Sequence, residues 1–81
     1  MNVIIYSTAT CPYCHMLKEW LRKNKIEYRD VAVDTDQKAA EEMIEKSGQM
    51  GVPVTIVEKD GKENIVIGFD KQKLSGLLDI K

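Results

Sequence analysis

The stretch VIIYSTATCPYCH, residues 3–15, decides how the rest of the chain is arranged. Its first part, residues 3–6, is apolar at consecutive positions, which is typical of a strand covered on both faces. From Cys11 onward the apolar residues recur at helical spacing, and Pro12 suits a first helical turn because its missing N–H costs nothing there. The stretch also holds the two cysteines and the one histidine of the chain. We therefore predict a strand, a loop and a helix, with both cysteines where the helix begins.

The size and charge of the chain limit what it can be. Its 81 residues suit a single small domain, which we expect to span residues 1–81. Acidic and basic residues nearly cancel to a net charge of −1, and the lysines and arginines are spread along the chain. Because no basic block is present, we expect neither nucleic acid nor a membrane surface as a partner.

The cysteine usage points to chemistry rather than to a structural disulfide. Residues 1–6 are too few and wrongly flanked for a secretory signal, and no apolar run approaches the roughly 20 residues of a membrane helix. We therefore expect a cytoplasmic protein, in a compartment where thiols are kept reduced. Two cysteines separated by two residues also close too small a loop to stabilise a fold much.

The hydrophobic pattern predicts an α/β fold with a four-stranded mixed sheet and helices on both faces. The first two strands are expected to be parallel because a helix joins them, and the last two to form an antiparallel hairpin. The order is strand, helix, strand, helix, strand, strand, helix. The expected elements are a strand at 3–6, a helix at 11–25, a strand at 27–33, a helix capped by Asp34 or Asp36 and ending near 47, strands at 54–57 and 64–67 around Asp60-Gly61, and a helix capped by Asp70.

Helical spacing also predicts which side chains face the core. In the first helix Lys18, Glu19, Arg22 and Lys23 are expected to face water. The residues expected inward are Leu17, Trp20 and Leu21, with Tyr13 and Met16 as further candidates, in the first helix; Ala40, Met43 and Ile44 in the second; and Leu74, Leu77, Leu78 and Ile80 in the third.

The two cysteines are expected to have different roles. A helix N-terminus carries about half a positive charge and unpaired N–H groups, which favour a thiolate over a thiol. Cys11 lies nearer the helix end and solvent, so we predict that it attacks a target disulfide. Cys14, one turn further in, is predicted to be buried and to resolve the mixed disulfide, which leaves a Cys11–Cys14 disulfide for a reductant. Pro12 and Tyr13 would fix the geometry of the turn and shield one side.

Other roles for the cysteines stay open at this point. Cys11-Pro12-Tyr13-Cys14-His15 satisfies the Cys-x-x-Cys-His pattern of haem attachment, but that attachment usually accompanies export. We expect His15 to be a helix-surface residue. A tetrahedral zinc site needs a second pair of ligands, which one chain lacks, so no resident metal is expected. An iron–sulfur or metal centre shared through Cys11 of two chains is the alternative function.

With its strand before and its helix after, Cys11-Pro12-Tyr13-Cys14 resembles the dithiol glutaredoxins. The resemblance covers nearly the whole chain, through Val52-Pro53 and Gly68. It implies a thioredoxin-like fold and a thiol–disulfide oxidoreductase that reduces protein or glutathione mixed disulfides through a redox-active Cys11–Cys14 disulfide. It further implies a cis bond before Pro53, which would face the cysteines, and a Val52 backbone that pairs with the bound thiol partner like an extra strand.

A few positions depart from the glutaredoxin pattern and concern the reductant. Thr8 stands where glutathione-using members commonly have lysine, and Gly51 where they commonly have threonine. Gln49 could still donate a hydrogen bond to glutathione, and Asp70, with the helix that follows it, could hold the γ-glutamyl group. The segment Gly68-Phe69-Asp70-Lys71 looks more like the glutaredoxin-like electron donors of ribonucleotide reductase, which take electrons from thioredoxin reductase.

These resemblances set the expected partners. The reductant is either glutathione, slightly favoured as co-substrate, or thioredoxin reductase, and no cofactor is expected to be bound. Disulfide-containing protein substrates are expected to dock on the rim formed by Tyr13, Val52-Pro53 and Phe69. We expect the protein to be a monomer.

Overall fold

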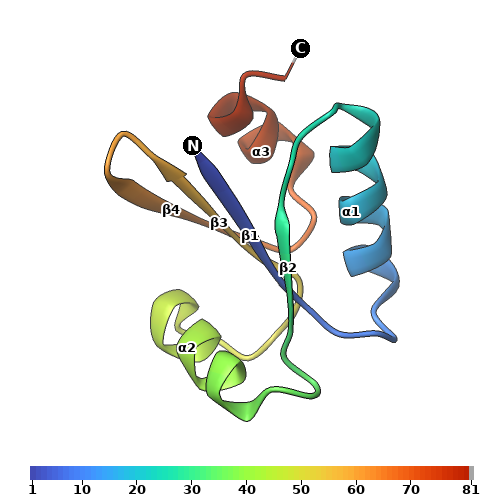
Figure 1. The fold of residues 1–81 in the computed structure, drawn as a ribbon, viewed down its shortest axis with the longest axis vertical. Helices are drawn as coiled ribbons and strands as arrows, with labels where there is room; N and C mark the ends of the chain where they lie inside the picture. Colours follow the sequence, from blue (N-terminus) through green and yellow to red (C-terminus); the bar gives the residue numbers. More distant parts are fainter. Residues whose placement is uncertain (81) are drawn as a thin grey trace.

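A computed structural model describes residues 1–80 of the chain, and its helices and strands follow one another in the predicted order (Figure 1). The longest helix, α1, has 12 residues. Within the described residues no helix is long and apolar enough to cross a membrane. The elements are β1 Asn2–Ser7, α1 Pro12–Lys23, β2 Arg29–Ala32, α2 Gln37–Ser47, β3 Val54–Lys59, β4 Lys62–Ile67 and α3 Lys71–Leu78.

The four strands form one mixed sheet in the order β2-β1-β3-β4. β1 runs parallel to β2 and antiparallel to β3, and β3 pairs with β4 in an antiparallel hairpin. Asp60 and Gly61 turn this hairpin with φ values of 54° and 75°, the left-handed conformation that two-residue hairpin turns favour. The predicted fold class is thereby confirmed, and β1 lies at the centre of the sheet, where its carboxyl end leads directly to Cys11.

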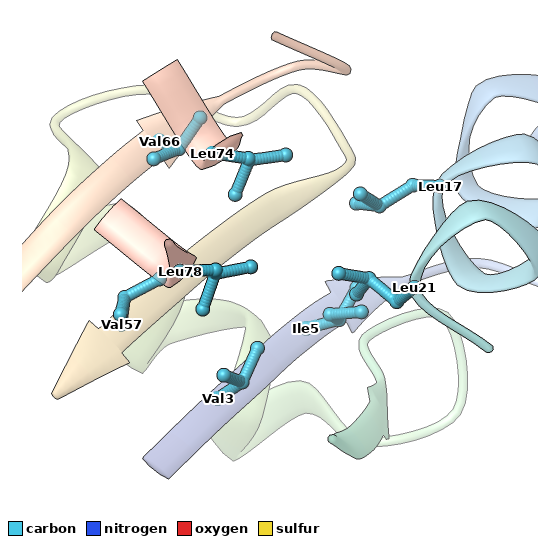
Figure 2. Close-up of a cluster of buried hydrophobic side chains, with 8 residues drawn as sticks. All are labelled: Val3, Ile5, Leu17, Leu21, Val57, Val66, Leu74 and Leu78. Atoms are coloured by element: carbon cyan, nitrogen blue, oxygen red, sulfur yellow. The ribbon is translucent and has the colours of Figure 1, made fainter. Parts of the chain in front are cut away.

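Both faces of the sheet are covered, which explains why β1 is apolar at consecutive positions. Val3 and Ile5 point to the face that carries α1 and α3, whereas Ile4 and Tyr6 point to the face that carries α2. Figure 2 shows leucines of α1 and α3 converging on side chains from three strands. The residues of this larger core are Val3, Ile5, Leu17, Leu21, Val57, Val66, Leu74 and Leu78.

In α1 the buried stripe differs from the predicted one. Cys14, Leu17 and Leu21 are fully buried, as i, i+3 and i+7 positions on one face should be. The prediction that Tyr13 and Met16 face the core is wrong, because they are 62% and 52% exposed. Each precedes a buried residue by one position, which turns its side chain about 100° around the helix axis, away from the sheet.

Lys18 is a second correction in α1. We predicted that it faces water, but only 15% of its side chain is exposed. Its ammonium lies 2.8 Å from Oδ2 of Asp30 on β2. The edge strand β2 therefore offers α1 a carboxylate, which accounts for a lysine on the sheet-facing side.

α2 packs on the opposite face of the sheet through a shorter stripe. Asp36 rather than Asp34 caps it, with Oδ1 accepting the N–H of Ala39 at 3.1 Å. Ala39 and Met43 are buried, the latter as predicted, whereas Ala40 is half-buried, and the prediction that Ile44 faces the core is wrong because Ile44 is 37% exposed. Residues 39 and 43 are four positions apart and so share one face of the helix, whereas residues 40 and 44 lie about 100° further around its axis.

α3 follows its prediction closely. Asp70 caps the helix, and Leu74 and Leu78 are buried against the core. Leu77 and Ile80 pack on the same core and are partly buried. The segment 68–70 joins the end of β4 to the beginning of α3.

Candidate active site

Cys11 is the N-cap residue of α1. Its backbone is extended, with φ −88° and ψ 111°, and Pro12 takes the first helical position. The Cys11 sulfur accepts the backbone N–H of Cys14 at 3.2 Å, and the Cys11 carbonyl accepts that of His15 at 3.2 Å. The first turn of α1 thus directs a backbone donor at the Cys11 sulfur, and a negative charge there would be stabilised by that donor and by the helix dipole.

Cys14 has the opposite environment. It is fully buried, whereas Cys11 is partly exposed. Burial, followed by its hydrogen bond with the Cys11 side chain, raises the pKa of Cys14 to about 12. Cys14 is therefore a protonated thiol at neutral pH, placed one turn behind the accessible sulfur.

Val52 and Pro53 form the opposite wall of the site. The peptide bond between them is cis, as the resemblance to glutaredoxins implied. The Val52 carbonyl lies 3.9 Å from the Cys11 sulfur, whose thiol donates to it. Pro53 is buried and leads directly into the central strand β3. Two segments about 40 residues apart in the sequence therefore meet at Cys11.

Gly68 joins the same cluster from the end of β4. Its N–H donates to the Pro53 carbonyl at 2.8 Å, and its φ of 78° is a left-handed conformation that glycine adopts without strain. Phe69 then turns toward α1 and packs edge-on against Trp20, with ring centroids 5.8 Å apart. The Lys71 ammonium lies 5.4 Å from the centre of the Phe69 ring.

Phe69 also borders a shallow hollow beside the site. Its volume is about 240 Å³, and Met16, Trp20 and Lys71 are among the residues that line it. Met16 is exposed, and Tyr13, the other exposed large apolar residue of α1, lies about one turn nearer the start of the helix. Their exposure extends the predicted rim of Tyr13, Val52-Pro53 and Phe69 by one residue, Met16, which the sequence had placed in the core.

Gln49 and Asp70 are held by local contacts. The Gln49 amide nitrogen donates to the Gly51 carbonyl at 2.9 Å, and its oxygen accepts the Gly51 N–H at 2.7 Å. A Cβ atom at position 51 would lie 2.8 Å from that Gln49 oxygen, so this closed loop depends on glycine. Asp70 uses Oδ1 to accept the N–H of Lys73 at 3.1 Å. Both predicted glutathione contacts therefore already have partners within the chain.

His15 lies on the helix surface, as predicted. Its side chain is exposed, and Nε2 donates to the Ala9 carbonyl at 2.8 Å. In residues 1–80 no three side chains of His, Cys, Asp or Glu come together as metal ligands. The metal-binding alternative therefore gains no support from the part of the chain that the structure describes.

The sequence did not predict one cluster of polar side chains near the cysteines. Ser7, Lys18 and Asp30 form a hydrogen-bonded cluster on the α1 face of the sheet. The available signal was the spacing of Lys18, which comes four residues after Cys14 and so shares its face of the helix. The partner carboxylate could not be identified from the sequence, because it lies on a different element.

Comparison with known proteins agrees with this geometry. The glutaredoxin family model matches residues 3–62. An uncharacterized glutaredoxin-like 8.6 kDa protein in the rubredoxin operon of Clostridium pasteurianum is 45% identical over 75 residues, which cover 93% of this chain and 95% of that protein. Glutaredoxin 3 of Escherichia coli K12 is 37% identical over 57 residues, covering 70% of this chain and 69% of the relative.

A solved structure shows the same fold over the full length. The thioredoxin-like protein BC3987, as its T8A mutant, superimposes with a TM-score of 0.86 at 29% identity, covering 99% of this chain and 97% of that one. The family match covers more than half of the chain, and the shared fold places the cysteine pair between β1 and α1. The chain therefore belongs to the glutaredoxin family of thiol–disulfide oxidoreductases.

Proposed function

We propose that the protein reduces protein or glutathione mixed disulfides through a reversible Cys11–Cys14 disulfide. The observation that supports this most directly is the unequal placement of the two sulfurs. Cys11 is partly exposed and accepts a backbone N–H at the start of α1, whereas Cys14 is fully buried one turn behind it. A nucleophile must be accessible, and a resolving thiol needs only to reach the adduct formed on its neighbour.

The reaction proceeds in two exchanges. The Cys11 thiolate attacks one sulfur of the target disulfide, forms a mixed disulfide and releases the other sulfur as a thiolate. The Cys14 sulfur then attacks Cys11, gives up its proton and expels the reduced target, leaving the Cys11–Cys14 disulfide. Two reductant thiols reverse these steps: the first forms a mixed disulfide with Cys11, and the second attacks that adduct, which restores both protein thiols and leaves the reductant as a disulfide.

The loop before β3 supports the way a substrate would be held. The Val52 carbonyl lies next to the Cys11 sulfur, so the extended backbone of a bound partner could pair with Val52 while its own sulfur meets Cys11. Tyr13, Met16 and Phe69 provide apolar surface on the other side. Substrates that fit this geometry are disulfides in extended segments or mixed disulfides with small thiols such as glutathione.

We propose glutathione as the reductant, with thioredoxin reductase as the second candidate. Similarity to a protein named glutaredoxin 3 supports glutathione. Two features favour the second candidate. Thr8 replaces a lysine that would attract a glutathione carboxylate, and the Gln49 amide is closed onto Gly51. The Gln49 amide nitrogen uses one of its two N–H groups for the Gly51 carbonyl, which leaves one for glutathione.

Parallel turnover assays test both parts of the proposal. The protein is supplied with NADPH and a disulfide substrate, in one series with glutathione and glutathione reductase and in the other with thioredoxin reductase. Turnover in the glutathione series is the expected result, and turnover in the thioredoxin reductase series alone would replace the reductant. C11S and C14S variants provide matched controls. No turnover in either series by correctly folded protein would contradict the proposed function.

A further inference from the structure

A charged cluster lies on the same face of α1 as Cys14. The Lys18 ammonium contacts Oδ2 of Asp30 at 2.8 Å, and the Ser7 hydroxyl donates to Oδ1 of the same carboxylate at 2.5 Å. Ser7 is 2% exposed and the Lys18 side chain 15% exposed, while 40% of the Asp30 side chain remains accessible. Three elements therefore contribute to one cluster, and Figure 1 shows two of them, α1 and β2, side by side.

The cluster lies close to Cys14 because Lys18 belongs to the same helix face. Lys18 lies one helical turn beyond Cys14, at the i+4 spacing that brings side chains together on a helix. Ser7 precedes Thr8, whose carbonyl accepts the N–H of Cys11 at 3.4 Å. Tyr6, next to Ser7, pairs with Val54 across the sheet. Ser7 therefore lies near the start of β3, which Pro53 precedes.

Within residues 1–80, no cation other than Lys18 is among the groups that shift the Cys14 pKa. His15 is on the helix surface and its Nε2 is used by Ala9. Asp34 accepts the N–H of the same Ala9 at 3.1 Å. Pro53 and the first two residues of β3, Val54 and Thr55, are uncharged and buried. Cys11, the N-cap residue of α1, also raises the Cys14 pKa, but it carries no negative charge once it is in the mixed disulfide that Cys14 attacks.

The resolving step gives this lysine a role. Burial raises the pKa of Cys14 to about 12, whereas a backbone hydrogen bond from Thr8 and, after it, the Lys18 charge act in the opposite direction. A buried thiol attacks slowly unless something favours its charged form, and a nearby ammonium group does so. Lys18 can act in this way only if it stays on the inner side of the helix instead of extending into water.

We propose that Lys18, held by Asp30 and Ser7, is a positioning residue that stabilises the negative charge developing on Cys14 as it attacks the mixed disulfide on Cys11. This inference rests on the proposed roles of the two cysteines. In that step the Cys14–Cys11 bond forms, the bond between Cys11 and the target sulfur breaks, and the target leaves as a thiolate that takes up the proton lost by Cys14. No further oxidant or reductant is needed.

Asp30 and Ser7 keep the cluster assembled at neutral pH. Partial burial alone would raise the pKa of Asp30, but the hydrogen bonds from Lys18 and Ser7 outweigh it and hold that pKa below the ordinary 3.8. Because the pKa is lowered, the carboxylate is charged throughout the neutral range and loses its charge only as the pH falls through the lowered value. Lys18 therefore keeps its partner under all conditions in which Cys14 reacts.

A single-turnover experiment isolates the resolving step. The reduced protein is treated with 5,5′-dithiobis(2-nitrobenzoate). Attack by Cys11 releases one coloured thiolate and leaves the other half of the reagent as a mixed disulfide on Cys11. The release of this second half as a coloured thiolate reports the attack by Cys14. Release is followed over a pH series for wild type and for Lys18→Gln. The Lys18→Gln variant is expected to release the thiol about tenfold more slowly at neutral pH and to move the pH profile about one unit toward alkaline pH.

Matched variants separate this role from a merely structural one. Lys18→Arg keeps the charge and should restore most of the rate, whereas Arg22→Gln removes an exposed charge from the next turn and should leave both rate and profile unchanged. Thermal unfolding of each variant checks the fold. An unchanged profile in folded Lys18→Gln would overturn the inference. Absence of the second release in wild type, matching the C14S variant, would instead contradict the proposed role of Cys14.

Discussion

The beginnings of α1 and α2 have the same local geometry and different chemistry. In α2 the Asp36 carboxylate accepts the N–H of Ala39 at 3.1 Å, and in α1 the Cys11 sulfur accepts the N–H of Cys14 at 3.2 Å. Both residues have extended backbones and precede the helix by one position. An aspartate is among the best N-caps known, and a neutral thiol is a weak acceptor.

The difference shows what the chain gains from a sulfur in this position. A permanent carboxylate at α2 stabilises the helix and reacts with nothing. At α1 the capping acceptor is a partly exposed sulfur, which can also attack a disulfide once it is deprotonated. The beginning of α1 therefore exchanges some helix stability for reactivity, and that of α2 does not.

The largest expected effect is on activity and comes from Cys11→Ser. Serine is a good N-cap, so the variant should unfold at the same temperature as wild type or higher, while disulfide reduction falls to the background of the assay. Cys11→Ala is the control, because it removes both the nucleophile and the cap. Turnover by folded Cys11→Ser above background would mean that Cys14 or another group attacks the substrate.

The corresponding change in α2 should have the opposite result. Asp36→Ala removes the cap and should lower the free energy of unfolding by about 1 kcal/mol, which for a domain of this size lowers the melting temperature by about 4–8 °C. Turnover should be unchanged. Asp36→Asn keeps a capping oxygen and should recover most of the stability. Loss of turnover in Asp36→Ala at a temperature where it is folded would mean that the cap of α2 affects catalysis, which contradicts a purely structural role for Asp36.

α3 provides an intermediate case, because Asp70 is both a cap and a predicted glutathione contact. Asp70→Ala should lower the free energy of unfolding by up to about 1 kcal/mol, since α3 is short and its cap is exposed. If Asp70 also holds the γ-glutamyl group, the KM for glutathionylated substrate rises in Asp70→Asn, which retains the cap. An unchanged KM in Asp70→Asn would leave Asp70 a purely structural residue like Asp36.

The smallest effect is expected away from all three helix starts. Lys46 at the end of α2 pairs with Glu63 of β4 at 2.7 Å, and both side chains are substantially exposed. Lys46→Ala should change the free energy of unfolding by less than about 1 kcal/mol and leave turnover unaltered, because exposed ion pairs contribute little. Equilibrium denaturation measures the change, and a loss larger than that of Asp36→Ala would contradict this ranking.

Local signals in the sequence were enough to predict most of the fold. The apolar run of β1, the Asp60-Gly61 turn and the cap at Asp70 each depend on neighbouring residues, and each was confirmed. The position of the cysteine pair between β1 and α1 was predicted for the same reason. These features needed no knowledge of which elements pack together.

What could not be predicted depends on contacts between distant segments. The rotation of α1 that exposes Tyr13 and Met16 is set by the side chains of the sheet beneath it. Lys18 is drawn inward by a carboxylate on another strand. Likewise the hydrogen bond between Gln49 and Gly51 could not be predicted, because it depends on the conformation of an irregular loop.

The relative reactivity of the two sulfurs tests most directly whether Cys11 is the nucleophile and Cys14 the resolving thiol. The reduced protein is exposed at neutral pH to less than one equivalent of iodoacetamide, and peptide mapping by mass spectrometry locates the modification. We predict that Cys11 alone is modified, because Cys14 is buried and its pKa is raised to about 12. Unfolding before labelling should make the two cysteines equally reactive. Modification of Cys14 at a rate equal to or above that of Cys11 in the folded protein would contradict the assignment of nucleophile and resolving thiol.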